Sequence, residues 1–365
     1  MSVQVPKITT KDINKSLIIK AGSKLYPKGI SASAFKRAWD QGFNGSGIRV
    51  AVIDTGVDGN HPDLKGQVIK SVNLTNERNI INPHGTHVAG TIAGTGKKWV
   101  VGGAPGCKIL SYKALSQNGG AISTIITAIN QAVNDGCNII NMSLGAVDVP
   151  QADINALTNC INNAYNRGVI CIVASGNDGI STCSIDPYEW PAAVQVAESI
   201  AACDVQPDLD TITLASFSNE NDRVDVSACG VNVVSTVLNG LYGIYSGTSM
   251  ATPHVSAMAA VLAQRLRRQN PRLSGANFSR ALTAEIKKNV KYFSACGNIS
   301  VGGKNLITTL NCKPPQEGNI KSLEIYPKYN TSFGNGFVRY DPTKGPVIPG
   351  GTAYYYSGIF LGHQL

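Results

Sequence analysis

Val50-Ala51-Val52-Ile53-Asp54-Thr55-Gly56 is an apolar run that ends in a carboxylate and a glycine. A short apolar run bounded by a turn signal is consistent with a strand buried on both faces of a sheet. A carboxylate directly after such a strand lies at the carboxyl edge of the sheet, where open α/β folds gather their functional groups. The stretch therefore predicts a buried strand and a polar site at its end.

The same pattern of buried apolar runs recurs along the chain. We expect buried strands at 48–53, 108–114, 137–143 and 169–175, with helices at 84–94, 122–134 and 154–166. Strands that alternate with helices imply a mostly parallel sheet with helices on both faces. The sequence thus predicts an α/β fold.

Two further motifs carry residues suited to nucleophilic chemistry. Ser249 begins an apolar helix in Gly247-Thr248-Ser249-Met250-Ala251-Thr252-Pro253-His254-Val255, and His84 begins a small-residue helix in His84-Gly85-Thr86-His87-Val88-Ala89-Gly90. A serine hydroxyl needs a neighbouring base to take its proton, and a neutral imidazole does this near neutral pH. A buried carboxylate must then orient the imidazole, and Asp54 is the candidate. We expect His87 and His254 to be packed helix residues.

A fourth motif offers hydrogen-bond donors for a developing negative charge. Asn177 follows an apolar strand in Val169-Ile170-Cys171-Ile172-Val173-Ala174-Ser175-Gly176-Asn177-Asp178-Gly179. Its amide, together with the backbone N–H of Ser249 at a helix start, can stabilise an oxyanion.

The four motifs, in the order Asp54, His84, Asn177, Ser249, resemble the subtilisin-like serine proteases over about residues 34–269, with a layout closest to the intracellular subtilisins. The resemblance implies a serine endopeptidase with an Asp54-His84-Ser249 triad and Asn177 in the oxyanion hole. The alternative is a catalytically silent binding or scaffold protein of the same fold. Acyl transfer to an amine other than water also stays open.

The resemblance further implies a substrate-binding cleft with two edges. Ser143, Leu144 and Gly145 match one edge, and Gly119 and Gly120 match the other, with Ile122 lining an apolar pocket. An extended substrate would pair with these edges as an added strand. The alternative for Gly119-Gly120 is a plain loop before a helix. Asp178 would lie at the rim of the pocket for the residue before the cut and favour Lys or Arg there.

We expect no cofactor and no metal site. The loop where this family commonly binds calcium is here Thr95-Gly96-Lys97-Lys98-Trp99-Val100-Val101, which is poor in oxygen ligands, although Asp63 matches one family ligand. Calcium takes six to eight oxygens, so the sequence predicts that this site is lost. A weak structural cation near Asp204 stays open.

Composition limits the other classes of function. The chain has 365 residues, 43% of them hydrophobic and 15% charged, which indicates a globular protein. Its net charge of +9 is scattered without a basic and aromatic stripe, so we expect no nucleic-acid partner. No signal peptide or membrane-spanning run is evident, which favours a cytoplasmic protein acting on proteins or peptides. The cysteines are expected to be mainly reduced, with Cys296–Cys312 or Cys183–Cys203 as possible disulfides.

We predict a catalytic domain at 34–312 between two extensions. The N-terminal extension, 1–33, contains the alternating segment Val3-Gln4-Val5-Pro6-Lys7-Ile8-Thr9-Thr10, which resembles the arm that crosses the cleft in intracellular subtilisins and implies a zymogen. A terminus without fixed structure is the alternative. The extension 313–365 is rich in Gly, Pro and Tyr, and is either an appendage packed on the domain or a docking segment for a partner.

Overall fold

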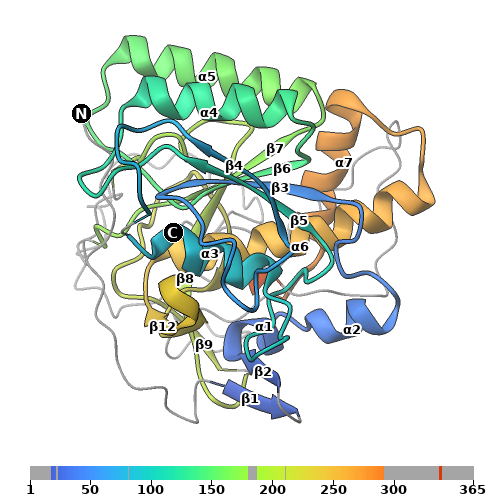
Figure 1. The fold of residues 1–365 in the computed structure, drawn as a ribbon. Helices are drawn as coiled ribbons and strands as arrows, with labels where there is room; N and C mark the ends of the chain where they lie inside the picture. Colours follow the sequence, from blue (N-terminus) through green and yellow to red (C-terminus); the bar gives the residue numbers. More distant parts are fainter. Residues whose placement is uncertain are drawn as a thin grey trace, which may run out of the picture.

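The computed structural model describes residues 18–21, 24–80, 82–179, 187–209, 211–291 and 337–338. A ten-stranded sheet lies at its centre (Figure 1). Along the sheet the strands are β13 (Val290–Lys291), β14 (Phe337–Val338), β10 (Val224–Cys229), β8 (Glu198–Val205), β7 (Ile170–Ala174), β6 (Ile139–Met142), β3 (Arg49–Asp54), β5 (Lys108–Lys113) and β4 (Val68–Asn73), with β9 (Ile212–Leu214) beside β8. All pairs are parallel except β8–β9 and β13–β14.

Helices cover both faces of this sheet. The helices α4 (Ile122–Asn134) and α5 (Gln151–Asn166) lie on one face, and α3 (His84–Ala93) and α6 (Thr248–Gln269) lie on the other, with α7 (Gly275–Lys288) beside α6 (Figure 1). The predicted α/β fold is confirmed. Helix α5 begins at Gln151, three residues before the predicted start, because the helix can follow directly on Pro150.

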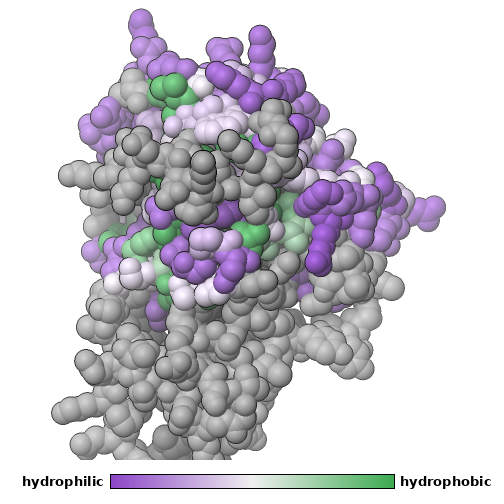
Figure 2. Space-filling model, turned by 90° about the horizontal axis from the view of Figure 1, so that it is seen from below, coloured by the Kyte–Doolittle hydropathy of each residue, from purple (hydrophilic) through white to green (hydrophobic). Residues whose placement is uncertain are grey.

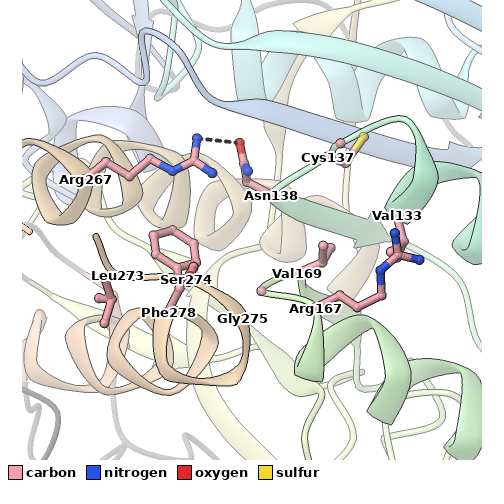
Figure 3. Close-up of a pocket in the computed structure, with 12 residues that line it drawn as sticks. Val133, Cys137, Asn138, Arg167, Val169, Arg267, Leu273, Ser274, Gly275 and Phe278 are labelled. Atoms are coloured by element: carbon pink, nitrogen blue, oxygen red, sulfur yellow. Dashed lines mark hydrogen bonds between the residues drawn. The ribbon is translucent and has the colours of Figure 1, made fainter. Parts of the chain in front are cut away.

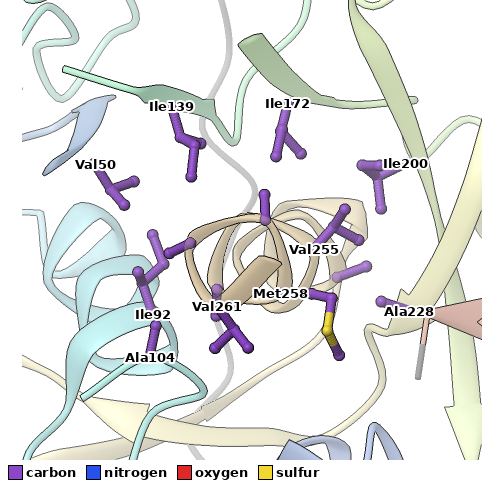
Figure 4. Close-up of a cluster of buried hydrophobic side chains, with 14 of the residues drawn as sticks. Val50, Ile92, Ala104, Ile139, Ile172, Ile200, Ala228, Val255, Met258 and Val261 are labelled. Carbon is purple, nitrogen blue, oxygen red and sulfur yellow. The ribbon is translucent and has the colours of Figure 1, made fainter. Parts of the chain in front are cut away.

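The alternation of side chains along β3 divides the core in two. Val50 and Val52 pack in the cluster around α3 and α6, whereas Ala51 and Ile53 pack in the cluster around α4 and α5. Figure 4 shows the first cluster, in which Val255, Met258 and Val261 of α6 lie among apolar side chains from the strands and from α3. Since both faces are buried, the end of β3 is fixed rigidly.

The remaining elements are short. They are β1 (Ile18–Ala21), β2 (Lys24–Pro27), α1 (Lys28–Ala32), α2 (Phe35–Asp40), β11 (Val233–Thr236), the 3-10 turn η2 (Leu238–Gly240) and β12 (Tyr242–Tyr245). The strands β11 and β12 form an antiparallel hairpin.

Parts of both predicted extensions contact the domain. Leu25 and Ile30 are buried, and Lys28 pairs with Asp204 at 3.1 Å. Phe337 and Val338, from the predicted C-terminal extension, form β14 between β10 and β13. The predicted arm at 3–10 lies outside the described residues, so the domain boundaries stay predictions.

The described residues form no large apolar face in the view from below (Figure 2). In Figure 2 the described residues are mostly hydrophilic, with hydrophobic residues in small separate groups. Within the described ranges, no helix combines the length and the apolar character needed to cross a bilayer.

Candidate active site

Asp54 and His84 form a buried pair at the carboxyl edge of the sheet. Asp54 is the last residue of β3, and His84 is the first residue of α3. His84 Nδ1 lies 2.8 Å from Asp54 Oδ1 and 3.0 Å from Oδ2, and the side chains of His84 and Asp54 are 1% and 0% exposed. Because a carboxylate only accepts, Nδ1 carries the proton, and Nε2 of the neutral ring is left as a base.

Neighbouring backbone contacts fix this pair. The N–H of Thr55 donates to Asp54 Oδ1 at 2.7 Å, and the N–H of Gly85 donates to Thr55 Oγ1 at 3.0 Å. A Cβ at Gly85 would lie 2.5 Å from the carbonyl oxygen of Gly56 and 3.1 Å from Asp54 Oδ1. Only glycine therefore lets the start of α3 approach the end of β3 this closely.

Ser249 is the second residue of α6 and is tied to the loop after β6. Pro253 has no N–H to offer the carbonyl of Ser249 four residues earlier. The hydroxyl of Ser143 supplies the missing donor at 2.8 Å. Asn141 in turn donates to Ser143 Oγ at 3.0 Å and accepts from Ser256 Oγ at 2.7 Å. The Ser143 hydroxyl thus replaces the N–H that Pro253 lacks, and this hydrogen bond connects α6 to the predicted substrate edge.

The Ser249 hydroxyl and the His84 ring are both buried, but they are not hydrogen-bonded to each other. Ser249 Oγ donates to the carbonyl of Ser143 at 3.1 Å, and His84 Nε2 is a buried atom with no partner. Catalytic hydrogen bonds often form only once substrate is bound. The strands β7, β6 and β3 are neighbours, so the loops that carry Asn177, Ser143 and Asp54 share one edge of the sheet.

The Asn177 amide is oriented by Thr248. The backbone N–H of Thr248 lies 2.8 Å from Asn177 Oδ1, and Thr248 Oγ1 lies 3.0 Å from the same oxygen. An N–H only donates, so the amide oxygen must face it. The Asn177 side chain is exposed, and its NH2 group, the donor end of the amide, is directed away from Thr248. This is the arrangement that an oxyanion donor needs.

The other predicted substrate residues lie near these loops. Leu144 and Ile122 are buried, at 3% and 6% exposure. Gly119 closes a tight turn with Ser116, with backbone hydrogen bonds in both directions, and it has a φ of 97°. A Cβ at Gly120 would clash with the carbonyl of Ala114. The turn itself thus requires these glycines. Pairing of a substrate backbone with Gly119 and Gly120 stays a prediction.

The two other helix histidines are packed residues, as predicted. His87 Nε2 lies 3.0 Å from the carbonyl of Val233, the ring stacks on Tyr245, and burial lowers the pKa of His87 to about 3. His254 Nδ1 lies 2.9 Å from the carbonyl of Met250, and burial lowers its pKa to about 4. Both rings are neutral at physiological pH and are already held by carbonyls.

Asp63 organises the loop where a calcium site was considered. Its buried carboxylate accepts hydrogen bonds from the backbone N–H groups of Lys98, Trp99 and Val100, and from the Tyr242 hydroxyl at 2.7 Å. Donors therefore surround the carboxylate and would repel a cation. Among the described residues, no group of three or more His, Cys, Asp or Glu is placed to hold a metal.

We expect Asp63→Asn to destabilise the protein by about 3 kcal/mol, because an amide cannot accept all these bonds and leaves buried donors unpaired. EDTA should change the melting temperature of the unmodified protein only slightly. Thermal unfolding with and without EDTA measures both effects, with Asp148→Asn as an exposed control. A large drop with EDTA would show that a metal site was missed.

A cavity of about 250 Å³ lies at the other end of the sheet (Figure 3). It is bordered by the residues just before β6 and β7 and by the start of α7, including Asn138, Arg167, Arg267 and Phe278. The carboxyl ends of β3, β6 and β7 are at the opposite edge. Its lining residues include no carboxylate or histidine, so it is separate from the Asp54 and His84 pair.

Sequence reasoning missed Glu189. Its carboxyl group lies against Gly145, Gly176 and Asp178, next to the predicted oxyanion residue. No motif contains it, since it stands in Pro187-Tyr188-Glu189-Trp190, far along the chain from Gly145. Only folding brings it to this edge.

Comparisons with known proteins show which family the chain resembles. A model described as "Subtilase family" matches residues 45–305. The "Thermophilic serine proteinase" of Bacillus sp. (strain AK1) is 42% identical over 234 residues, which cover 62% of this chain and 55% of that protein. The "Major intracellular serine protease" of Bacillus subtilis (strain 168) is 38% identical, covering 65% of this chain and 74% of the relative. The "Minor extracellular protease Epr" of the same strain is 36% identical, covering 74% of this chain and 39% of that relative. The first and third relatives are thus spanned over only about half of their length or less.

Proposed function

The chain belongs to the subtilase family of serine proteases, and from this premise we propose that it is a serine endopeptidase with Asp54, His84 and Ser249 as its triad. The observation that carries the assignment is the buried His84–Asp54 pair, whose unpartnered Nε2 lies at the same sheet edge as the loops around Ser249. Side chains and backbone N–H groups of the chain supply this chemistry, so the proposal needs no organic cofactor.

The reaction would proceed in two halves. His84 Nε2 takes the proton of Ser249 Oγ as that oxygen attacks the peptide carbonyl, and Asp54 stabilises the imidazolium. The amide NH2 of Asn177 and the N–H of Ser249 hold the oxyanion. His84 then gives its proton to the leaving amine. Water repeats the sequence on the acyl-enzyme and releases the second product.

Covalent labelling tests the proposal directly. A fluorophosphonate should attach to Ser249, and labelling should be absent in Ser249→Ala. A folded protein that neither reacts with the probe nor hydrolyses any peptide of a diverse library would instead support the silent scaffold. Added amines that divert the acyl-enzyme from water would reveal acyl transfer.

The cleft residues complete the proposal. Ser143, Leu144 and Gly145 would pair with the substrate on one side, and Gly119 and Gly120 on the other, with Ile122 in an apolar pocket and Asp178 at the rim. This proposal is supported by two hydrogen bonds between Ser143 and Ser249. The Ser143 hydroxyl donates to the Ser249 carbonyl, and the Ser249 hydroxyl donates to the Ser143 carbonyl. Any substrate strand on this edge would lie beside the nucleophile.

An inhibitory N-terminal arm is part of this proposal, although 3–10 lies outside the described residues. Deleting residues 2–17 should raise the initial rate on small peptides, because an arm bound as a pseudo-substrate blocks the cleft. Kinetics of truncated and full-length protein measure this. Mass spectrometry must show that the full-length N-terminus stays intact during the assay. Equal initial rates under that condition would rule out the arm.

We further propose that the partners are protein or peptide substrates, without nucleic acid or membrane. A cytoplasmic location is supported by relatives named as intracellular, although Epr is named as extracellular. A docking role for 313–365 would have to leave β14 in the sheet. A cation beside Asp204 would compete with Lys28, 3.1 Å away, and is expected to bind weakly.

A further inference from the structure

Glu189 is a carboxyl group that the proposed catalytic steps do not use. Ala146 and Trp190 exchange two backbone hydrogen bonds of 3.0 and 2.9 Å, and these hold Glu189 opposite Gly145. A Cβ added at Gly145 or at Gly176 would collide with the Glu189 carboxyl oxygens. The carboxyl group therefore lies against both glycine backbones, between the loop after β6 and the loop after β7.

This slot requires its two glycines. Gly176 has a φ of 113°, which L side chains rarely adopt, and Gly145 has no room for a side chain while Glu189 is present. The same two loops carry the predicted substrate edge and Asn177. The acid is thus placed beside the reacting groups by the fold.

Glu189 forms an acid pair with Asp178. The carboxyl group of Glu189 interacts with that of Asp178 and with the backbone N–H of Asn177. Burial and the neighbouring negative charge of Asp178 raise the pKa of Glu189 to about 8. Asp178 is exposed, and Asn219 holds it through bonds of 2.7 and 3.2 Å. A pKa of about 8 leaves Glu189 mostly protonated near neutral pH.

The other charged groups around this slot already have partners. Arg223 donates to the carbonyls of Ala193 and Val194, and Asp222 accepts from the Tyr188 hydroxyl. Asp178 is thus the charged side chain that acts directly on Glu189.

We propose that Glu189, with Asp178 at the rim, forms the acidic end of the pocket for the side chain immediately before the cut bond, and that it selects Lys or Arg there. This inference rests on the proposed function, because Gly145 and Asn177 border that side chain only when Ser249 is the nucleophile. A substrate cation would replace the proton of Glu189, which passes to solvent. Both carboxylates then face the cation.

Binding to the Ser249→Ala protein tests the inference without turnover. Two fluorescent peptides are compared that differ only in Lys or norleucine before the expected cut, since norleucine keeps the chain but lacks the charge. We expect tighter binding of the Lys peptide. Adding Glu189→Gln should lower the Lys-to-norleucine affinity ratio about tenfold, because a charge-assisted hydrogen bond is lost. Asp148→Asn, an exposed carboxylate three residues after Gly145, is the control and should leave the ratio unchanged.

A pH series gives an independent readout that does not depend on the Glu189 variant folding. The affinity ratio of the Ser249→Ala protein should rise between pH 6 and pH 9, because Glu189 loses its proton over this range while the Lys ammonium stays charged. A ratio that is flat with pH, or unchanged by Glu189→Gln, would overturn the inference. Failure of the active protein to react with fluorophosphonate would instead count against the endopeptidase proposal, so the two failures are distinguishable.

Discussion

Ser249→Ala and His84→Ala should each reduce kcat for peptide hydrolysis by about 10⁶-fold, a magnitude known from subtilisin itself and carried over by family membership. Without the Ser249 hydroxyl there is no nucleophile, and without the His84 ring no group takes its proton. Because the two residues act as one unit, the double variant should be little slower than either single variant. Steady-state kinetics on a peptide substrate measure all three.

The matched control is Ser246→Ala, which removes an exposed hydroxyl three residues before Ser249. Its hydroxyl oxygen accepts a hydrogen bond from the loop N–H of Asn232 at 2.9 Å, away from the triad, so activity should be near normal. Thermal unfolding should show that each variant is folded. Near-normal turnover in a folded Ser249→Ala protein would mean that the nucleophile lies elsewhere.

Asp54→Asn should lower kcat by about 10⁴-fold. Asparagine has nearly the shape of aspartate, but it carries no charge to stabilise the imidazolium. Its NH2 group can also face His84 Nδ1, which then keeps its lone pair and moves the proton to Nε2, so the ring loses its base. The loss should appear in kcat and in kcat/KM alike, because the interaction is made in the transition state.

Asp58→Asn is the control for this change. Asp58 lies four residues after Asp54 and accepts hydrogen bonds from the backbone N–H groups of Asn60 and Asn239. It touches neither His84 nor Ser249 in these bonds, so its activity should stay within a few-fold of normal. A folded Asp54→Asn protein with the same small effect would reject Asp54 as the orienting carboxylate.

Local patterns were enough to predict the fold and its central strands. The buried runs at β3, β5, β6 and β7 are apolar because both faces of the sheet are covered, and this leaves a clear signal in the sequence. The short elements β9, β11 and β12 give no such signal, because each has only three or four residues and pairs antiparallel with the strand next to it in the chain. The start of α5 was missed by three residues, because the polar residues after Pro150 hide the beginning of the helix.

Local sequence patterns are enough to identify the residues proposed for the chemistry, because Asp54, His84, Asn177 and Ser249 each end, follow or begin an element with a strong local pattern. How these residues are held depends on contacts that form only in the folded chain. Ser143 completes the hydrogen bonding that Pro253 removes from α6, and Asp63 occupies the loop where a cation could have been bound. Glu189 reaches the site only because Ala146 and Trp190 pair across more than forty residues. Such contacts depend on positions in space and not on neighbours in the chain, so no local pattern encodes them.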